Sequence, residues 1–271
     1  MTTKRTGGRS GTSGAGKGAT PTRPSGRDLT VRVKTAARRK TSSTRWLQRQ
    51  LNDPYVVEAR RRGLRSRAAF KLMQLDEKFD LLRPGDRVVD LGAAPGGWTQ
   101  VAIERCRKGT VDPKVVAVDY LPMEPVAEAT VLELDFLDDD APERIIAALD
   151  GQANVVLSDM AAPTTGHHNT DHLRIMGLAE AAYEFAERVL APGGTFISKL
   201  FQGGAEKTLL DRLKRDFKKV RHAKPEASRS DSSEMYVVAT GFRGNPGGDS
   251  SGNSGGSESG PASQAPYAAQ G

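Results

Sequence analysis

The stretch DLGAAPGGWTQ, residues 90–100, decides how this chain is interpreted. It follows the apolar residues of RVV, 87–89, so a strand gives way to a segment with three glycines and one proline within six residues. A plain turn would account for this break, and so would a loop that lets the backbone approach a nucleotide-like ligand. The rest of the sequence must decide between the two.

Beyond this loop, strand-like and helix-like segments alternate along the chain. Strands are predicted at residues 87–92, 114–120, 129–136, 153–160, 195–202 and 234–242. Helices are predicted at residues 55–79 (broken near Gly63), 96–107, 141–150, 171–194 and 206–217. This order, with short connections, predicts an open parallel α/β sheet with helices on both faces. Ligands of such sheets bind at the carboxyl ends of the strands.

Composition and charge divide the chain into three parts. Residues 1–50 contain 13 Lys or Arg and one acidic residue, a charge of +12 in a chain whose net charge is +7. We expect residues 1–45 to form a disordered basic arm, 46–242 the folded domain, and 243–271 a disordered Gly/Ser-rich tail. A basic arm on a mildly acidic body is typical of nucleic-acid binding, although it could serve solubility alone.

The remaining composition excludes several classes of protein. Cys106 is the single cysteine of the 271 residues, which argues against a disulfide framework or a cysteine-rich zinc site. The sequence has no apolar leader and no run of roughly 18 apolar residues. We therefore expect a cytoplasmic protein without a membrane partner.

Charged and aromatic residues at successive strand ends indicate the ligand. Gly92 and Gly97 match the outer glycines of the dinucleotide fingerprint, but Ala94 takes the middle position and no phosphate loop with Gly-Lys-Ser/Thr is present. Asp119 could bind ribose hydroxyls, and Asp135 with Phe136 could bind and cover an adenine. An adenosyl group without a diphosphate fits best, which points to S-adenosyl-L-methionine.

Five motifs carry a family resemblance: RSRAAFKL (65–72), VVDLGAAPGGW (88–98), LSDMA (157–161), SKLFQG (198–203) and EMYVVATG (234–241). Together they resemble the RlmE/FtsJ family of bacterial ribose 2′-O-methyltransferases. The resemblance implies a Rossmann-like, mostly parallel seven-stranded sheet with helices on both faces. It also implies methylation of a uridine ribose in 23S ribosomal RNA of the large subunit, with no protein partner.

The same resemblance assigns the site residues. It places a catalytic set at Lys71, Asp159, Lys199 and Glu234. It implies cofactor contacts at Gly96, Trp98, Asp119, Asp135 and Asp159. The glycine-rich loop and the third strand end add Gly92, Pro95, Gly97 and Phe136 to the predicted cofactor-binding set. The chain departs from the family pattern after SDMA, where Ala162 and Pro163 stand in place of Pro-Asn.

Physical chemistry supports the catalytic set independently. A ribose hydroxyl is a weak nucleophile and needs a base during the transfer step. A lysine, with an ordinary pKa of about 10.4, becomes a base when burial or a nearby cation lowers that pKa. We assign Lys199 as the base and Lys71 as the neighbouring cation, with Asp159 and Glu234 orienting both ammonium groups. Phe70 and Leu72, which flank Lys71, are predicted core residues.

Two further clusters admit more than one interpretation. Arg60, Arg61, Arg62, Arg65 and Arg67 form either a solvated face or a phosphate-binding platform, and we prefer the platform. The segment GHHNTDH, residues 166–172, contains three histidines, His167, His168 and His172, with Asp171 among them. We expect no metal there, but a polar loop in which Thr170 or Asp171 caps a helix.

Alternative chemistries are constrained but not all removed. Cys106 lies within a predicted helix, not at a strand end where a cytosine-C5 methyltransferase needs its nucleophile. No Asn- or Asp-Pro-Pro-aromatic loop typical of amine methyltransferases follows the fourth strand. Two alternatives stay open: a 2′-O-methyltransferase of the same fold acting on tRNA or another rRNA position, and a non-catalytic RNA-binding assembly factor.

Overall fold

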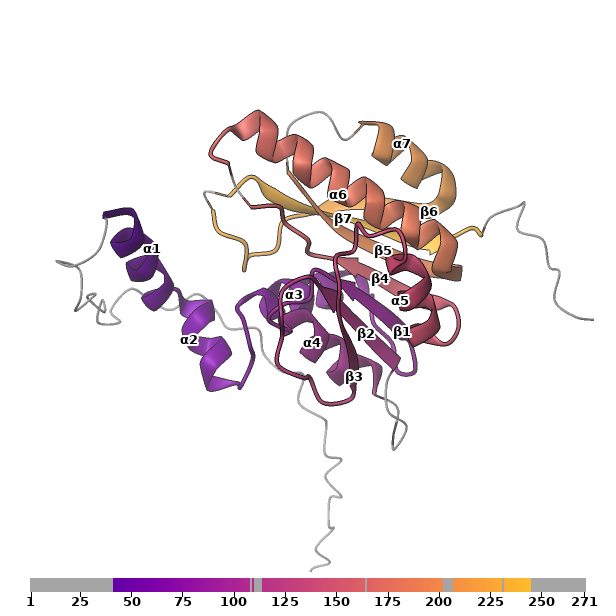
Figure 1. Cartoon of the computed structure of the whole chain (residues 1–271), viewed down its shortest axis with the longest axis horizontal. Helices are drawn as coiled ribbons and strands as arrows, with labels where there is room; N and C mark the ends of the chain where they lie inside the picture. The colour runs from indigo at the N-terminus through magenta and orange to yellow at the C-terminus, as the bar shows by residue number, and fades with distance from the viewer. Residues whose placement is uncertain are drawn as a thin grey trace, which may run out of the picture.

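A seven-stranded sheet organises the chain. The computed structural model describes residues 41–107, 109, 114–163, 165–201, 207–230 and 232–244. The strands lie in the order β3-β2-β1-β4-β5-β7-β6, and β7 runs antiparallel to both of its neighbours (Figure 1). The predicted Rossmann-like, mostly parallel seven-stranded sheet is confirmed.

The elements alternate as the sequence predicts. The strands are β1 (Arg87–Leu91), β2 (Lys114–Asp119), β3 (Ala129–Glu133), β4 (Ala153–Ser158), β5 (Leu190–Phe201), β6 (Phe217–Ala223) and β7 (Glu234–Phe242). The helices are α1 (Thr41–Leu51), α2 (Pro54–Arg61), α3 (Ala68–Phe79), α4 (Gly97–Cys106), α5 (Ala141–Leu149), α6 (His168–Val189) and α7 (Lys207–Asp216). The central strands are almost continuously apolar because helices cover both of their faces.

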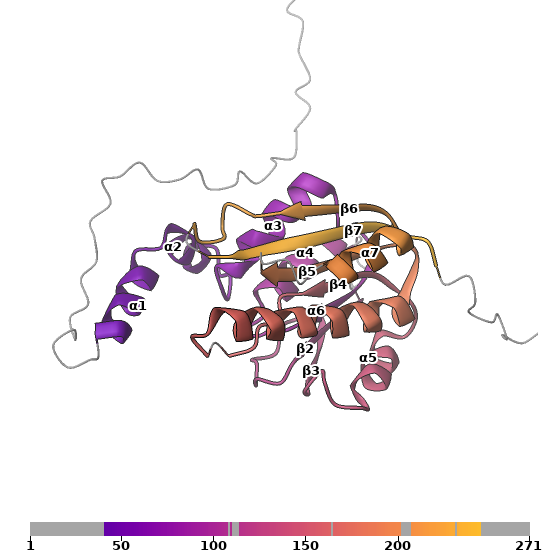
Figure 2. The same cartoon turned by 90° about the horizontal axis from the view of Figure 1, so that it is seen from above.

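Two apolar clusters pack on opposite faces of the sheet. Helices α3 and α4 cover one face, where Phe70, Leu72 and Trp98 are almost completely buried. Helices α5, α6 and α7 cover the other, with Ile145 and Tyr183 in its core. Figure 2 shows α3 and α6 on opposite sides of the strands. The prediction that Phe70 and Leu72 are core residues is confirmed, since neither is exposed.

Helices α1 and α2 extend from one side of the sheet domain (Figures 1 and 2). Asp53 begins α2 by accepting a hydrogen bond from the Tyr55 N–H, and Pro54 occupies the first turn, where its missing N–H is harmless. Helix α1 begins at Thr41, inside the segment predicted to be a disordered arm. The rest of that arm, and the C-terminal tail from residue 245, lie outside the described residues.

Two local predictions differ from the structure. Strand β6 was not located by sequence, because FKKVRHA has few apolar residues; it is an edge strand, where charge is favourable. Helix α6 ends at Val189, not at residue 194, because Leu190 already pairs with Ala153 of β4. The next pair is Val155 with Thr195, so the Pro-Gly-Gly segment lies in an irregularity of the β4–β5 pairing. No helix in the described part of the chain has the length and apolar character needed to cross a membrane.

The predicted cap of α6 is also wrong. The N-cap is His167, which makes no side-chain capping bond. Asp171 instead reaches back from the first turn and accepts hydrogen bonds from the backbone N–H groups of Thr165 (2.7 Å) and Gly166 (3.2 Å). The carboxylate therefore fixes the loop that enters α6, and these bonds lower the pKa of Asp171.

Candidate functional site

The loop from β1 to α4 is shaped by two glycines with positive φ. Gly92 has φ +75°, and a Cβ atom there would lie 2.8 Å from the Met160 backbone, so no larger residue fits. Gly96 has φ +105° and is the N-cap of α4. These positions show why the strand must break here: the loop passes directly against the chain that leaves β4.

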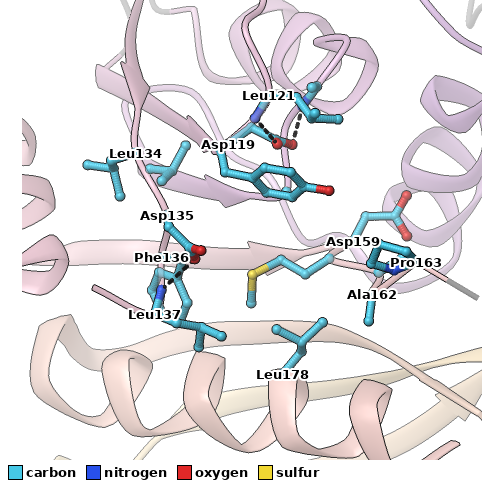
Figure 3. A pocket seen from close by; sticks show the side chains of 16 residues that line it. Asp119, Leu121, Leu134, Asp135, Phe136, Leu137, Asp159, Ala162, Pro163 and Leu178 are labelled. Atoms are coloured by element: carbon cyan, nitrogen blue, oxygen red, sulfur yellow. Dashed lines mark hydrogen bonds between the residues drawn. The ribbon is translucent and has the colours of Figure 1, made fainter. Parts of the chain in front are cut away.

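A cavity of about 510 Å³ opens beside this loop, at the carboxyl ends of β1, β2, β3 and β4 (Figure 3). We call it the nucleoside cavity. Its polar lining comes from Asp119, Asp135 and Asp159, and its apolar lining from residues that include Leu121, Leu134, Phe136, Leu137, Met160, Ala162, Pro163 and Leu178. Its volume lies within the roughly 300–1,000 Å³ of small-molecule sites.

The two carboxylates on the β2 and β3 side are held by main-chain N–H groups. Asp119 accepts from Ala94 N (2.9 Å) with one oxygen and from Leu121 N (2.9 Å) with the other. Asp135 accepts from Leu137 N (3.0 Å). Each carboxylate is thereby fixed in direction, which leaves its remaining lone pairs for hydroxyl or amino groups of a ligand.

The lining includes part of the predicted cofactor-binding set. Gly92, Asp119, Asp135, Phe136 and Asp159 all line the cavity. Neighbouring residues that the sequence analysis did not select also line it, chiefly Ala94, Tyr120 and Met160 beside the same strand ends. Each of the three is next in sequence to a predicted cofactor-binding residue, and this adjacency is the sequence signal that points to them.

Pro95, Gly96, Gly97 and Trp98 do not line this cavity. The Trp98 ring is buried, its Nε1 donates to Ala68 O at 2.8 Å, and it packs on the Tyr236 ring with centroids 5.5 Å apart. The indole therefore belongs to the core between α3 and α4. Any contact of this segment with a ligand would come from its backbone.

The chemistry of the cavity suits an adenosyl group. Asp119 and Asp135 can accept hydrogen bonds from ribose hydroxyls and an adenine amino group, and Phe136 offers an aromatic surface held edge-on by Phe185 at 5.7 Å. Among the described residues, no cationic side chain lines the cavity, so none is placed there to pair with a diphosphate. These residues fit S-adenosylmethionine better than a dinucleotide.

A second, charged group of side chains begins where the nucleoside cavity ends. Lys199 Nζ donates to the main-chain oxygen of Asp159 (2.6 Å) and to its Oδ1 (3.0 Å). Lys71 Nζ forms an ion pair with Glu234 Oε1 at 2.6 Å. The four predicted catalytic residues therefore come together as two ion pairs, with side chains 8–16% exposed.

Tyr236 joins these two pairs and was missed by the sequence analysis. Its hydroxyl lies 2.8 Å from Asp159 Oδ1 and 3.1 Å from Glu234 Oε1, and it accepts from Lys71 Nζ at 3.2 Å. The ring is fully buried. We call Lys71, Asp159, Lys199, Glu234 and Tyr236 the charged network.

Electrostatics keep the network ionised at its Asp159 end. Burial raises the pKa of Asp159, but the nearby charges of Lys199 and Lys71 and the hydrogen bond from Tyr236 outweigh it, so the pKa is lowered. Burial together with the Asp159 and Glu234 charges raises the pKa of Tyr236 well above its ordinary value. Tyr236 is therefore neutral, and its single hydroxyl proton can be donated to Asp159 or to Glu234, but not to both at once.

Sheet register explains the assembly. Lys199 of β5 pairs directly with Tyr236 of β7, and Phe201 pairs with Glu234. Directly paired residues project from the same face, so Lys199 and Tyr236 both face α3, which supplies Lys71. Because β7 is antiparallel, its first residues meet the carboxyl end of β5.

The predicted arginine platform is divided in the structure. Arg61 and Arg62 both bind Glu58 at 2.6 Å, and Arg60 is exposed on the same helix. Arg65 instead donates to the carbonyls of Pro95, Glu124 and Pro125, so it braces the loops around the cavity. Arg67 forms an ion pair with Asp53 and donates to Ala227 O.

Neither the histidine segment nor the cysteine contributes a reactive centre in this region. Within the described ranges, no three His, Cys, Asp or Glu side chains are grouped as a metal ion would require. Cys106 lies in α4 as predicted, is fully buried, and has its pKa raised by burial to about 12. A thiolate nucleophile is therefore disfavoured at this position.

Comparisons with known proteins agree with this geometry. A family model described as FtsJ-like methyltransferase matches residues 64–242. The chain is 67% identical over 222 residues to the ribosomal RNA large subunit methyltransferase E of Paramagnetospirillum magneticum, an alignment that covers 80% of this chain and 90% of the relative. It is 64% identical over 239 residues to the protein of the same name from Rhodospirillum rubrum, covering 87% and 89%. A solved structure described as a ribosomal RNA methyltransferase from Plasmodium falciparum has a TM-score of 0.59 at 30% identity, covering 67% of this chain and 100% of that chain.

Proposed function

Because the chain belongs to the FtsJ-like methyltransferase family, we propose that it methylates the 2′-hydroxyl of a uridine ribose in 23S RNA of the large ribosomal subunit. The observation that carries the proposal is the position of Asp159, which lines the nucleoside cavity and also belongs to the charged network. A methyl donor in the cavity and an acceptor beside the network would meet at this residue. Relatives named as methyltransferases of large-subunit ribosomal RNA support the choice of substrate.

The nucleoside cavity is the proposed site of S-adenosyl-L-methionine. Asp119 and Asp135 would bind the ribose and adenine, and Phe136 would cover the base. When bound, this cofactor supplies a methyl group already activated by a sulfonium. The protein must then align the acceptor and remove its proton.

Lys199 is the proposed general base. As the ribose O2′ took the methyl group that the cofactor would supply, with the sulfur keeping the electron pair of the broken bond, the hydroxyl proton would pass to Lys199 Nζ. Asp159 lies 3.0 Å from this nitrogen, so its carboxylate stabilises the ammonium that the transfer creates. Lys199 is paired with Asp159 at 3.0 Å in the structure, so it must release one proton to solvent before the step, and it regains its charge when it accepts the hydroxyl proton.

Lys71, Glu234 and Tyr236 are proposed to orient this pair. Lys71 places a second positive charge next to the Tyr236 hydroxyl, and the Glu234 carboxylate, 2.6 Å from Lys71 Nζ, neutralises that charge. Ser228 Oγ also donates to Glu234 Oε1 at 3.0 Å, which fixes the carboxylate. The arrangement holds Asp159 in one rotamer while the proton moves.

The test uses S-adenosylmethionine labelled in its methyl group and ribosomes from cells that lack the modification. The expected result is label in 23S RNA, resistant to alkaline cleavage at one uridine. Label in tRNA, or at a different rRNA position, would favour the other 2′-O-methyltransferase reading. RNA binding with no transferred label would identify a non-catalytic binding protein and overturn the proposal.

A further inference from the structure

A second cavity lies on the other side of the charged network. Its volume is about 460 Å³, and its lining includes Gln50, Arg67, Lys71, Arg229, Ser232 and Glu234. We call it the arginine cavity. It receives side chains from α1, α3 and the β6–β7 loop, and its inner wall is the Lys71–Glu234 ion pair. It therefore reaches the charged network from a side that the nucleoside cavity does not occupy.

Two guanidinium groups in this cavity share one carboxylate. Asp53 Oδ2 lies 2.9 Å from Arg67 Nε and 4.0 Å from Arg229 Nε. The other oxygen of Asp53 accepts from Tyr55 N at the start of α2, so part of its charge already interacts with a helix N-terminus. With Lys71 and Glu234 included, three cations face two carboxylates among the described side chains, an excess of one positive charge within that set.

The two arginines differ in freedom. Arg67 is 17% exposed, donates to Ala227 O, and has its guanidinium over the Tyr55 ring at 5.8 Å. Burial lowers the pKa of Arg67; the Asp53 carboxylate opposes this effect and the Arg229 charge adds to it. Arg229 is 35% exposed, and its 4.0 Å separation from Asp53 makes a weak ion pair. Arg229 can turn toward an incoming anion at little cost.

We propose that the arginine cavity binds the RNA backbone phosphate adjacent to the ribose that is methylated, with Arg67 as the fixed donor and Arg229 as the mobile one. This inference rests on the proposed function, because it places that phosphate beside Lys71 and Glu234. A guanidinium pair matches a phosphate in both charge and donor geometry. The Lys71–Glu234 pair fixes the inner end of the cavity, so a phosphate held here would position the attached sugar.

The first experiment measures RNA binding by the full chain at several salt concentrations, without any methyl transfer. Arg229→Gln should weaken binding about tenfold and should reduce the slope of log Kd against log[salt] by about 0.7–0.9, the share of one phosphate. Arg229→Lys should preserve the slope because it keeps the charge. Arg188→Gln, on α6 and paired with Glu143, is the matched control and should change neither quantity.

The second experiment replaces single phosphates of a substrate RNA by neutral methylphosphonates, position by position. Neutralising the phosphate next to the modified ribose should cost the parent about tenfold in Kd. It should cost Arg229→Gln less, because only Arg67 then remains to contact that phosphate. If Arg229→Gln binds RNA with the parent slope, or if the neutral phosphate weakens both proteins equally, the assignment is wrong. If Arg229→Gln does not fold, the scan on the parent decides, since a flat scan overturns the site.

These readouts separate the two proposals. Failure of the parent to transfer label would overturn the proposed function and leave the binding result intact. Normal transfer with an unchanged salt slope in Arg229→Gln would overturn the phosphate site alone.

Discussion

The nucleoside cavity and the charged network are adjacent, but they are built in opposite ways. The carboxylates of Asp119 and Asp135 are held by backbone N–H groups of the loops at the strand ends, as Asp135 is by Leu137. The network depends on side chains more than 150 residues apart in sequence, such as Lys71 and Tyr236. The nucleoside cavity is therefore fixed by local backbone contacts. The charged network forms only when α3 packs on the sheet and β4, β5 and β7 are paired in the correct register.

This difference predicts different responses to substitution. A change in the cavity should weaken cofactor binding and leave the chemical step near normal. A change in the network should slow the chemical step and leave cofactor affinity near normal. Asp159 alone belongs to both regions, since it lines the cavity and binds Lys199.

The largest effect is expected from Lys199→Ala. Removal of the general base should reduce kcat about 1,000-fold, within the range of acid–base catalysis. Affinity for S-adenosylhomocysteine, measured by calorimetry, should change only a few-fold, because Lys199 does not line the nucleoside cavity. Lys214→Ala, an exposed lysine on α7, is the control. Retained turnover in Lys199→Ala would remove the base assignment.

Asp90 lies between the two regions and offers a test by pH. Burial raises the pKa of its carboxyl from 3.8 to about 7, and the charges of Asp159 and Asp119 act in the same direction. Thr99 Oγ1 donates to Oδ2 at 2.7 Å, while Oδ1 has no hydrogen-bond partner among the described residues. Between pH 3.8 and 7 the folded state therefore binds a proton that the unfolded state has released.

Protonation of Asp90 in the folded state means that this state becomes less stable as pH rises. This contribution to stability is complete below pH 3.8 and is lost as pH rises to about 7. Relative to Asp90→Asn, which cannot ionise, the parent should lose about 3 kcal/mol of unfolding free energy between pH 5 and pH 8. Urea unfolding at both pH values measures this difference. Equal pH dependence in the two proteins would show that Asp90 is not the titrating group.

The same contrast explains what the sequence could predict. Asp119 and Asp135 could be placed because each needs only the end of its own strand to be located. Four of the five network residues were placed by motif, and their contacts required the full topology. Tyr236 could not be found in EMYVVATG, where it has the alternation of an ordinary buried strand residue; only its pairing with Lys199 gives its hydroxyl a role.

Three further differences between expectation and structure have equally specific causes. Trp98 was selected for its place in the glycine-rich motif, but its indole is used between α3 and α4. Strand β6 lies at the sheet edge, so its pairing with β7 requires no apolar pattern on the exposed residues. Arg65 was selected with its charged neighbours, yet its donors are directed at the carbonyls of three loop residues.

A smaller effect, confined to the cavity, is expected from Asp119→Asn. The amide keeps the size of the side chain but removes one acceptor and the charge, so cofactor affinity should fall by about 2 kcal/mol, or roughly 30-fold in Kd. Turnover at saturating cofactor should stay within a few-fold of the parent. A large loss of kcat with unchanged Kd would mean that the cavity and the network cannot be treated separately.

The smallest effect, and the most discriminating, is expected from Tyr236→Phe. Loss of the hydroxyl leaves Lys199 bound to Asp159 and Lys71 bound to Glu234, but separates the two pairs, so kcat should fall by about tenfold, the value of one hydrogen bond to a charged group. KM for RNA and affinity for S-adenosylhomocysteine should be unchanged. Tyr183→Phe is the matched control, because Tyr183 is equally buried and its hydroxyl contacts Asp216 Oδ2 on the opposite face of the sheet. Both variants should lose similar unfolding free energy, so a role limited to stability would affect the two alike. A fall in kcat for Tyr236→Phe alone would establish that this hydroxyl positions the network across the register of β5 and β7.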